Sequence, residues 1–123
     1  MDLFCKIYAS SVLSRNDMTG LLESITTPLL SIDYSLCINE DFNETKQIEF
    51  PDGFLFFPYY LEIEPAIINL DEEEIKRYFE QISTLSICLW SENISAITAC
   101  DFEELLTNNG GYKSLQVPFP IKE

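Results

Sequence analysis

Histidine is absent from this chain of 123 residues, which removes the commonest general base and the usual partner of serine or cysteine nucleophiles. The glycine-rich phosphate loops, the HExxH zinc motif and the GxSxG nucleophile turn are also missing. Glu62 and Glu64 are a carboxylate pair on one strand, but any two acids at this spacing would point the same way. These absences predict a protein that is not an enzyme and that uses no cofactor.

Cysteine pairs with metal-binding spacing are also missing. Cys5, Cys37, Cys88 and Cys100 are far apart and form no CxxC motif, so a zinc site would need all four thiolates to converge through folding alone. We therefore expect reduced cysteines that pack as small hydrophobic side chains, and no metal. The chain also shows no secretion signal and no apolar run near the roughly 18 residues of a membrane span. A cytoplasmic protein is expected.

Basic residues are scarce. Seven lysines and arginines stand against 21 acids, giving a formal net charge of −14, and residues 40–74 hold eleven of the acids with Lys46 as their one base. Nucleic-acid binding is disfavoured because it depends on Lys and Arg displacing phosphate counterions, and an anionic membrane is disfavoured for the same reason. The acids either keep a small domain soluble or attract a basic partner. Their concentration in one third of the chain favours the second interpretation.

Hydrophobic periodicity predicts two helices and four or five strands. A short helix is expected from Ser14 to Pro28, and a long one over 72–91, capped by Asn69 or Asp71 and stopped near Asn93. The buried stripe of the long helix is predicted to be Ile75, Phe79, Ile82, Leu85, Ser86 and Leu89, with Tyr78 on its flank. Strands are expected over 3–10, 30–39, 47–50, 54–63 and 94–100, with 101–106 as a helical turn and Asn108 to Gly111 as a break.

The element order predicts an α+β fold. Two helices on one face of a mostly antiparallel sheet of four to five strands form the ferredoxin-like split βαβ arrangement, in which the other sheet face stays open. We expect one domain over 1–123, with a core over 1–107 and an irregular tail over 108–123. The strand over 30–39 alternates, which predicts Leu30, Ile32, Tyr34, Leu36 and Ile38 inward and Ser31, Asp33, Ser35, Cys37 and Asn39 outward.

The sequence FPDGFLFFPYYLEIEP, residues 50–65, is rich in aromatic and acidic side chains. Pro51-Asp52-Gly53 is typical of a tight turn and predicts a hairpin arm between 47–50 and 54–63, while Pro58 favours a bulge or an edge. In a strand, the odd positions from Leu55 to Ile63 would be core, and Phe54, Phe56, Tyr60, Glu62 and Glu64 would share the other face. The aromatic residues of that face are either covered by the tail or second helix, or left for a partner.

Aromatic side chains rimmed by carboxylates are the composition expected of a binding surface for a basic protein, because the rings give desolvated anchors and the acids steer association. The expected open face carries Tyr8, Asp33, Cys37, Phe56, Tyr60 and Glu62. The candidate partner-binding residues are Asp33, Glu40, Asp41, Glu44, Asp52, Phe56, Tyr60, Glu62 and Glu64.

Three phrases of the chain carry a resemblance: FPDGFLFFPYYLEIEP, the DEEE start of the long helix, and ISAITACDFEELLTNNGG. Together they resemble the small acidic immunity proteins of bacterial polymorphic toxin and contact-dependent growth inhibition systems, over about residues 50 to 111. The resemblance implies a cytoplasmic protein that binds the C-terminal domain of a cognate toxin, often a basic nuclease, and blocks it. It implies no particular binding residues.

Two functions follow as hypotheses. The first is an immunity protein, monomeric on its own, that neutralises a basic toxin domain by stoichiometric occlusion. The second is a small-ligand-binding or regulatory ferredoxin-like domain that forms oligomers through its sheet. The size of the free protein, measured with and without candidate ligands, separates them.

Overall fold

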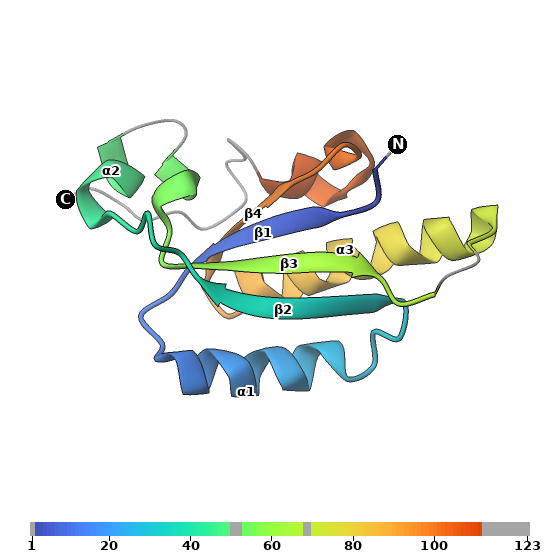
Figure 1. The fold of residues 1–123 in the computed structure, drawn as a ribbon, viewed down its shortest axis with the longest axis horizontal. Helices are drawn as coiled ribbons and strands as arrows, with labels where there is room; N and C mark the ends of the chain where they lie inside the picture. The colour runs from blue at the N-terminus through green and yellow to red at the C-terminus, as the bar shows by residue number, and fades with distance from the viewer. Residues whose placement is uncertain (1, 50–52, 68–69, 112–123) are drawn as a thin grey trace.

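The structure is a computed structural model that describes residues 2–49, 53–67 and 70–111. Its strands are β1 (Cys5–Ser10), β2 (Ile32–Ile38), β3 (Tyr59–Pro65) and β4 (Ser95–Ala99). Its helices are α1 (Arg15–Thr26), α2 (Glu44–Glu49) and α3 (Glu72–Ser91), with short 3-10 turns η1 (Gly53–Phe56), η2 (Glu103–Leu105) and η3 (Thr107–Gly111). Figure 1 shows α1 and α3 beside the sheet, and α2 and η1 together at one end of it.

In the described part of the chain, four strands form one antiparallel sheet in the order β2-β3-β1-β4. Two β-α-β units are interleaved, because β3 lies between β1 and β2, and β1 lies between β3 and β4. This is the ferredoxin-like arrangement, so the predicted fold class is confirmed. Among the residues described, no helix has the length and apolar character needed to cross a membrane.

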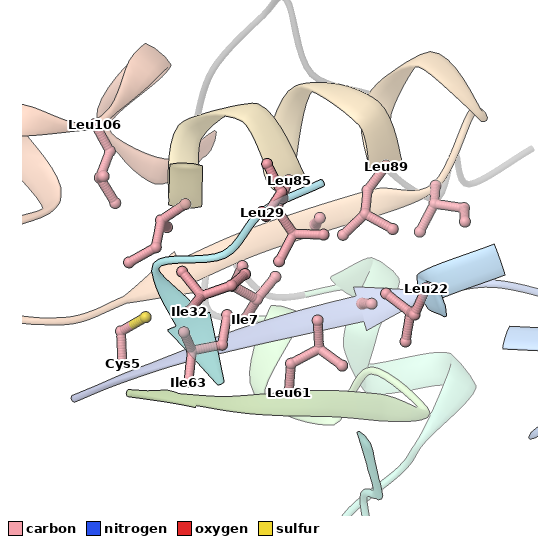
Figure 2. Packing of buried hydrophobic residues seen from close by; sticks show 14 of the residues in the cluster. Cys5, Ile7, Leu22, Leu29, Ile32, Leu61, Ile63, Leu85, Leu89 and Leu106 are labelled. Carbon is pink, nitrogen blue, oxygen red and sulfur yellow. The ribbon is translucent and has the colours of Figure 1, made fainter. Parts of the chain in front are cut away.

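The core lies between one face of the sheet and the two long helices. Strand residues that alternate inward, such as Ile7, Leu61 and Ile63, are fully buried against α1 and α3. Figure 2 shows Leu85 and Leu89 of α3 above the strands, with Leu22 of α1 completing the layer. Both long helices therefore cover the same face, as the split arrangement requires.

Local signals position both helices. The Ser14 side chain accepts a hydrogen bond from the Asp17 N–H, and Asp71 caps α3 by accepting from the Glu74 N–H at 2.8 Å. Beyond the other end of α3, Asn93 has φ 59°, and the Ile94 N–H returns to the Leu89 carbonyl at 3.0 Å. This Schellman closure turns the chain back into β4. The predicted caps at Ser14 and Asp71 and the stop at Asn93 are confirmed; Asn69 lies outside the described residues.

Tyr78 was predicted on the flank of the buried stripe, which is wrong. Its side chain is fully buried and is the first buried residue of the stripe, and its hydroxyl donates to the Leu3 carbonyl at 2.6 Å. The ring can occupy the core because that carbonyl satisfies its one polar group. Ile75 and Phe79, expected in the stripe, are only partly buried.

The predicted hairpin arm is also wrong. Helix α2 includes residues 47–49 of the strand expected over 47–50, and residues 54–56 belong to the 3-10 turn η1. Strand β3 begins only at Tyr59, directly after Pro58, which cannot donate a ladder hydrogen bond. The sheet therefore has four strands in the part described, and the segment between β2 and β3 is helical.

Side-chain hydrogen bonds explain the helical segment. The Asn43 side chain accepts from the Lys46 N–H at 3.0 Å, which caps α2. Gly53 lies so close to α2 that a β-carbon there would overlap the Gln47 carbonyl, so only glycine fits. Pro51 and Asp52 of the expected turn lie outside the described residues.

Several predicted orientations fail at the ends of elements. Leu30 is exposed because β2 begins only at Ile32, and Ile38 and Leu55 are exposed although both were expected inward. Asn39, expected outward, is buried. Residues 101–106 contain the expected helical turn, and positive φ angles from Asn108 to Gly111 form the expected break. Gly110 and Gly111, assigned to the tail, are buried beside β4.

Burial of Cys5 has a consequence at alkaline pH. Its place in the core raises the pKa of the Cys5 thiol from 9.0 to about 12. Desolvation is the largest cause, and the negative charge of a Cys100 thiolate is the next. The folded state thus holds the proton more tightly than the unfolded chain, so stability is full below pH 9 and falls from pH 9 towards pH 12. The loss of unfolding free energy that Cys5 causes approaches about 4 kcal/mol near pH 12.

We expect Cys5→Ala to flatten the decline of the unfolding free energy above pH 9, measured by urea denaturation at intervals of half a pH unit. Cys88→Ala is the control and should keep the decline, because it leaves Cys5 in place. An unchanged decline in Cys5→Ala would assign the alkaline sensitivity to other groups, such as Tyr78, whose pKa burial also raises.

Candidate functional site

The sheet face turned away from α1 and α3 carries the candidate residues of the strands. Strand pairing places Tyr60 between Tyr8 and Cys37, and Glu62 between Lys6 and Ser35. The next pair of β2 and β3 on this face is Asp33 with Glu64. Five of the six residues predicted for this face therefore share it: Tyr8, Asp33, Cys37, Tyr60 and Glu62. Ile97, opposite Tyr8 on β4, is 1 % exposed, so β4 adds no accessible surface beside Tyr8.

Phe56, the sixth predicted residue, lies on η1 instead of a strand, but η1 brings it back to the same face. There a hollow of about 410 Å³ opens between the ends of the strands and the helical segment. We call it the aromatic hollow; its lining residues are Lys6, Tyr8, Ile38, Asn39, Glu40, Asp41, Leu55, Phe56 and Tyr60. Four of the predicted partner-binding residues thus meet at one place: Glu40, Asp41, Phe56 and Tyr60.

The rings of this region pack on one another without being fully covered. Tyr8 contacts Phe54 edge-on with ring centroids 5.4 Å apart, and Tyr60 at 5.9 Å. Phe56 and Tyr60 remain partly exposed. The side chains of Ile38 (54 % exposed), Phe42 (48 %) and Leu55 (43 %) add apolar surface near the two acids Glu40 and Asp41.

Two lysines of the chain lie against these rings. The Lys6 ammonium is 4.8 Å from the centroid of the Tyr60 ring, and the Lys46 ammonium is 5.2 Å from that of Phe56. A cation over an aromatic face is attracted by the negative potential of the ring. Two of the three rings that line the hollow, Phe56 and Tyr60, therefore already accept a positive charge.

A second, smaller hollow of about 150 Å³ lies on the same face beyond Glu62. We call it the acidic hollow; it is lined by Phe4, Asp33, Tyr34, Ser35, Glu62, Ile63 and Glu64. It gathers three further predicted residues, Asp33, Glu62 and Glu64. Glu44 is exposed at the start of α2 and lines neither hollow, and Asp52 lies outside the described residues.

The negative charge of the face comes from its carboxylates. Burial and the neighbouring Glu62 carboxylate raise the pKa of the Cys37 thiol, which donates to Glu62 Oε1 at 3.6 Å. The charge of a Cys37 thiolate and then burial raise the pKa of the Tyr60 hydroxyl. Both groups therefore keep their protons at neutral pH and act as hydrogen-bond donors beside the acids.

Asn39 holds the hollow together, and sequence reasoning missed it. Its buried amide donates to the Leu55 carbonyl at 2.9 Å and to the Phe57 carbonyl at 2.7 Å, and its Oδ1 accepts from the Asp41 N–H at 3.0 Å. One side chain thus fixes both walls of the aromatic hollow to the end of β2. The sequence offers one signal for this role. Asn39 follows an alternating strand and precedes two acids, and asparagine side chains at such positions often bond to the backbone of a turn.

Lys6 and Ile38 were missed as well. Lys6 stands opposite Glu62 in the register, a pairing that no local pattern reveals. Ile38 follows the inward alternation of β2 but ends the strand, where it lines the hollow.

The pairing of Asp33 with Glu64 predicts a gain in stability on neutralisation. Like charges directly opposite on neighbouring strands destabilise a sheet by about 0.2–1 kcal/mol. We therefore expect Glu64→Gln to raise the unfolding free energy by about 0.5 kcal/mol, measured by urea denaturation in low salt. In 1 M NaCl the gain should shrink, because the two carboxylates are exposed to screening.

Glu62→Gln is the matched control, since it removes the same charge from the neighbouring position on the same face of β3. Glu62 faces Lys6 and accepts a hydrogen bond from the Cys37 thiol. Its neutralisation should therefore lower the unfolding free energy or leave it unchanged. Equal gains in both variants would mean that total charge, and not the Asp33–Glu64 pair, sets the effect.

In the described parts of the chain, no three Cys, Asp or Glu side chains are grouped so that they could hold a metal ion. All four cysteines are free thiols. Comparison of the chain with protein-family models, with curated proteins and with solved structures gave no match.

Proposed function

We propose that this protein is an immunity protein that binds a basic toxin domain through its open sheet face and blocks it by occlusion. The observation that carries the proposal is the aromatic hollow, where Phe56 and Tyr60 lie beside the carboxylates of Glu40 and Asp41. Occlusion needs a surface and no catalytic group, in keeping with a sequence that has no histidine.

The composition of the face supports a protein partner. Its exposed apolar side chains, Ile38, Phe42 and Leu55, adjoin the partly exposed rings of Phe56 and Tyr60. Protein interfaces combine an apolar and aromatic centre with a polar rim, and the acids provide such a rim here. The two hollows make this surface concave in two places, into which side chains of a complementary protein surface can fit.

The charge supports a basic partner. The net charge of −14 repels nucleic acid and attracts a cationic protein surface, which raises the rate of association. The resemblance of residues 50 to 111 to small acidic immunity proteins points to the same class of partner. The toxin domain would be the C-terminal domain of the protein encoded immediately upstream.

Co-expression tests the proposal. The toxin domain should stop growth when produced alone in bacteria, and growth should return when this protein is produced with it. Purified components should form a 1:1 complex by light scattering, and the free protein should be a monomer. Growth arrest that this protein does not relieve would contradict the proposal. A free oligomer that a small molecule stabilises would favour the ligand-binding alternative.

A further inference from the structure

The two lysine–aromatic contacts indicate which partner group the aromatic hollow accepts. Lys6 and Lys46, two of the seven bases in the chain, lie over Tyr60 and Phe56. Each contact places a positive charge on the face of a ring that is partly open to solvent. The free protein thus places its own cations over two of the three rings that line the hollow, Phe56 and Tyr60.

Carboxylates stand next to these rings. Glu40 and Asp41 are exposed and line the hollow together with Phe56 and Tyr60. A group that enters meets aromatic rings and carboxylates in the same lining. The guanidinium of arginine fits this pair best, because it is flat enough to stack on a ring and presents a fork of donors to a carboxylate. An ammonium is a compact, strongly hydrated charge that gains less from stacking.

We propose that the aromatic hollow is a guanidinium-binding site that takes an arginine side chain of the partner. The arginine stacks on the Tyr60 ring in place of Lys6 and donates to Glu40 or Asp41. The identity of the partner rests on the proposed function; the chemistry of the hollow rests on the contacts of Lys6, Tyr60 and the two acids.

Lys6 competes with the incoming arginine, because it occupies the ring and repels a second cation. A cation–π contact at an exposed site contributes about 0.5–1 kcal/mol, which corresponds to a factor of about two to five in affinity. Lys6→Met keeps most of the side-chain length but removes the charge. It should therefore bind arginine about two- to fivefold more tightly than the unchanged protein.

The test is an NMR titration of the full chain with a blocked Gly-Gly-Arg-Gly-Gly peptide, and with the same peptide carrying citrulline, the neutral isostere of arginine. The arginine peptide should shift the ring signals of Tyr8, Phe56 and Tyr60, and the citrulline peptide should not. Tyr60→Phe should keep the response and Tyr60→Leu should lose it, with the core amide spectrum of both variants reporting that the fold is intact.

Equal responses to both peptides would overturn the inference. So would arginine-induced shifts that are as large at Glu72, Glu73 and Glu74, the acids of the first turn of α3, since these would indicate unspecific charge attraction. If the peptide fails at the hollow while the toxin domain still forms its complex, the inference fails and the proposed function stands. If the peptide binds as expected and the toxin domain does not, the hollow is supported and the proposed function fails.

Discussion

Changing Glu40 and Asp41 together to lysine is expected to slow association with the toxin domain by about 10- to 100-fold at 50 mM salt, measured by stopped-flow mixing. The two acids are exposed and line the aromatic hollow, so the change inverts the potential where the partner binds. The difference in association rate between this variant and the unchanged protein should narrow as salt rises towards 1 M, because screening removes the steering that the acids provide.

The matched control changes Glu23 and Glu92 to lysine, which alters the net charge by the same amount. Both are exposed on the helical side of the molecule, near the carboxyl ends of α1 and α3, where a cation suits the helix dipole. This variant should associate only a few-fold more slowly than the unchanged protein. Equal slowing in the two variants would mean that the total charge steers binding and that the hollow has no special role.

Asn39→Ala is expected to lower the unfolding free energy by about 3 kcal/mol, or roughly 10 °C in Tm, measured by urea and thermal denaturation. The Asn39 side chain makes three hydrogen bonds in a buried position, to Leu55, Phe57 and Asp41. Its removal leaves two carbonyls without these donors and frees the walls of the aromatic hollow. Affinity for the toxin domain should therefore fall in the same variant.

Two further variants separate the Asn39 contacts from general effects. Asn39→Asp has the same size but replaces the amide donors by a carboxylate oxygen that repels the two carbonyls, so it should be as unstable as the alanine variant at neutral pH. Asn43→Ala removes one exposed helix cap and should cost about 1 kcal/mol. If Asn39→Ala lowers the unfolding free energy by no more than Asn43→Ala does, the role of Asn39 in holding Leu55 and Phe57 is contradicted.

The frame of the fold could be predicted because each of its elements carries its own signal. Strand β1 alternates and α3 has a continuous apolar stripe, so burying both on one core leaves few arrangements. Ser14, Asp71 and Asn93 mark helix limits by local hydrogen bonding, which depends only on near neighbours. The register then brought Asp33, Tyr60 and Glu62 to one face, as alternation predicts.

The segment between β2 and β3 could not be predicted in the same way. Its apolar run was compatible with a strand, and the deciding contacts come from Asn39, which lies sixteen residues before Leu55 and eighteen before Phe57. Tyr78 was misplaced for a similar reason, since its hydroxyl is satisfied by Leu3 across 75 positions. Lys6 entered the site through strand pairing alone. Long-range hydrogen bonds and pairings of this kind leave no periodic trace in a sequence.

A competing surface exists on the helical side. A groove of about 670 Å³ runs along α3 to η2, and its lining includes Ile75, Phe79, Ile87 and Leu105. Ile87 and Leu105 are 47 % and 61 % exposed, so this groove could also attract a partner. Its lining has two acids, Glu72 and Glu80, with Lys76, whereas the two hollows of the open sheet face together have five acids with Lys6, which makes the open face the more negative surface.

Hydroxyl-radical footprinting of the complex with the toxin domain separates the two surfaces most directly, because it reports the exposure of individual side chains. The open-face account predicts protection of Phe42, Leu55, Phe56 and Tyr60 from oxidation, with Phe79, Ile87 and Leu105 oxidised as in the free protein. Protection of the α3 groove together with unchanged oxidation of Phe56 and Tyr60 would contradict it.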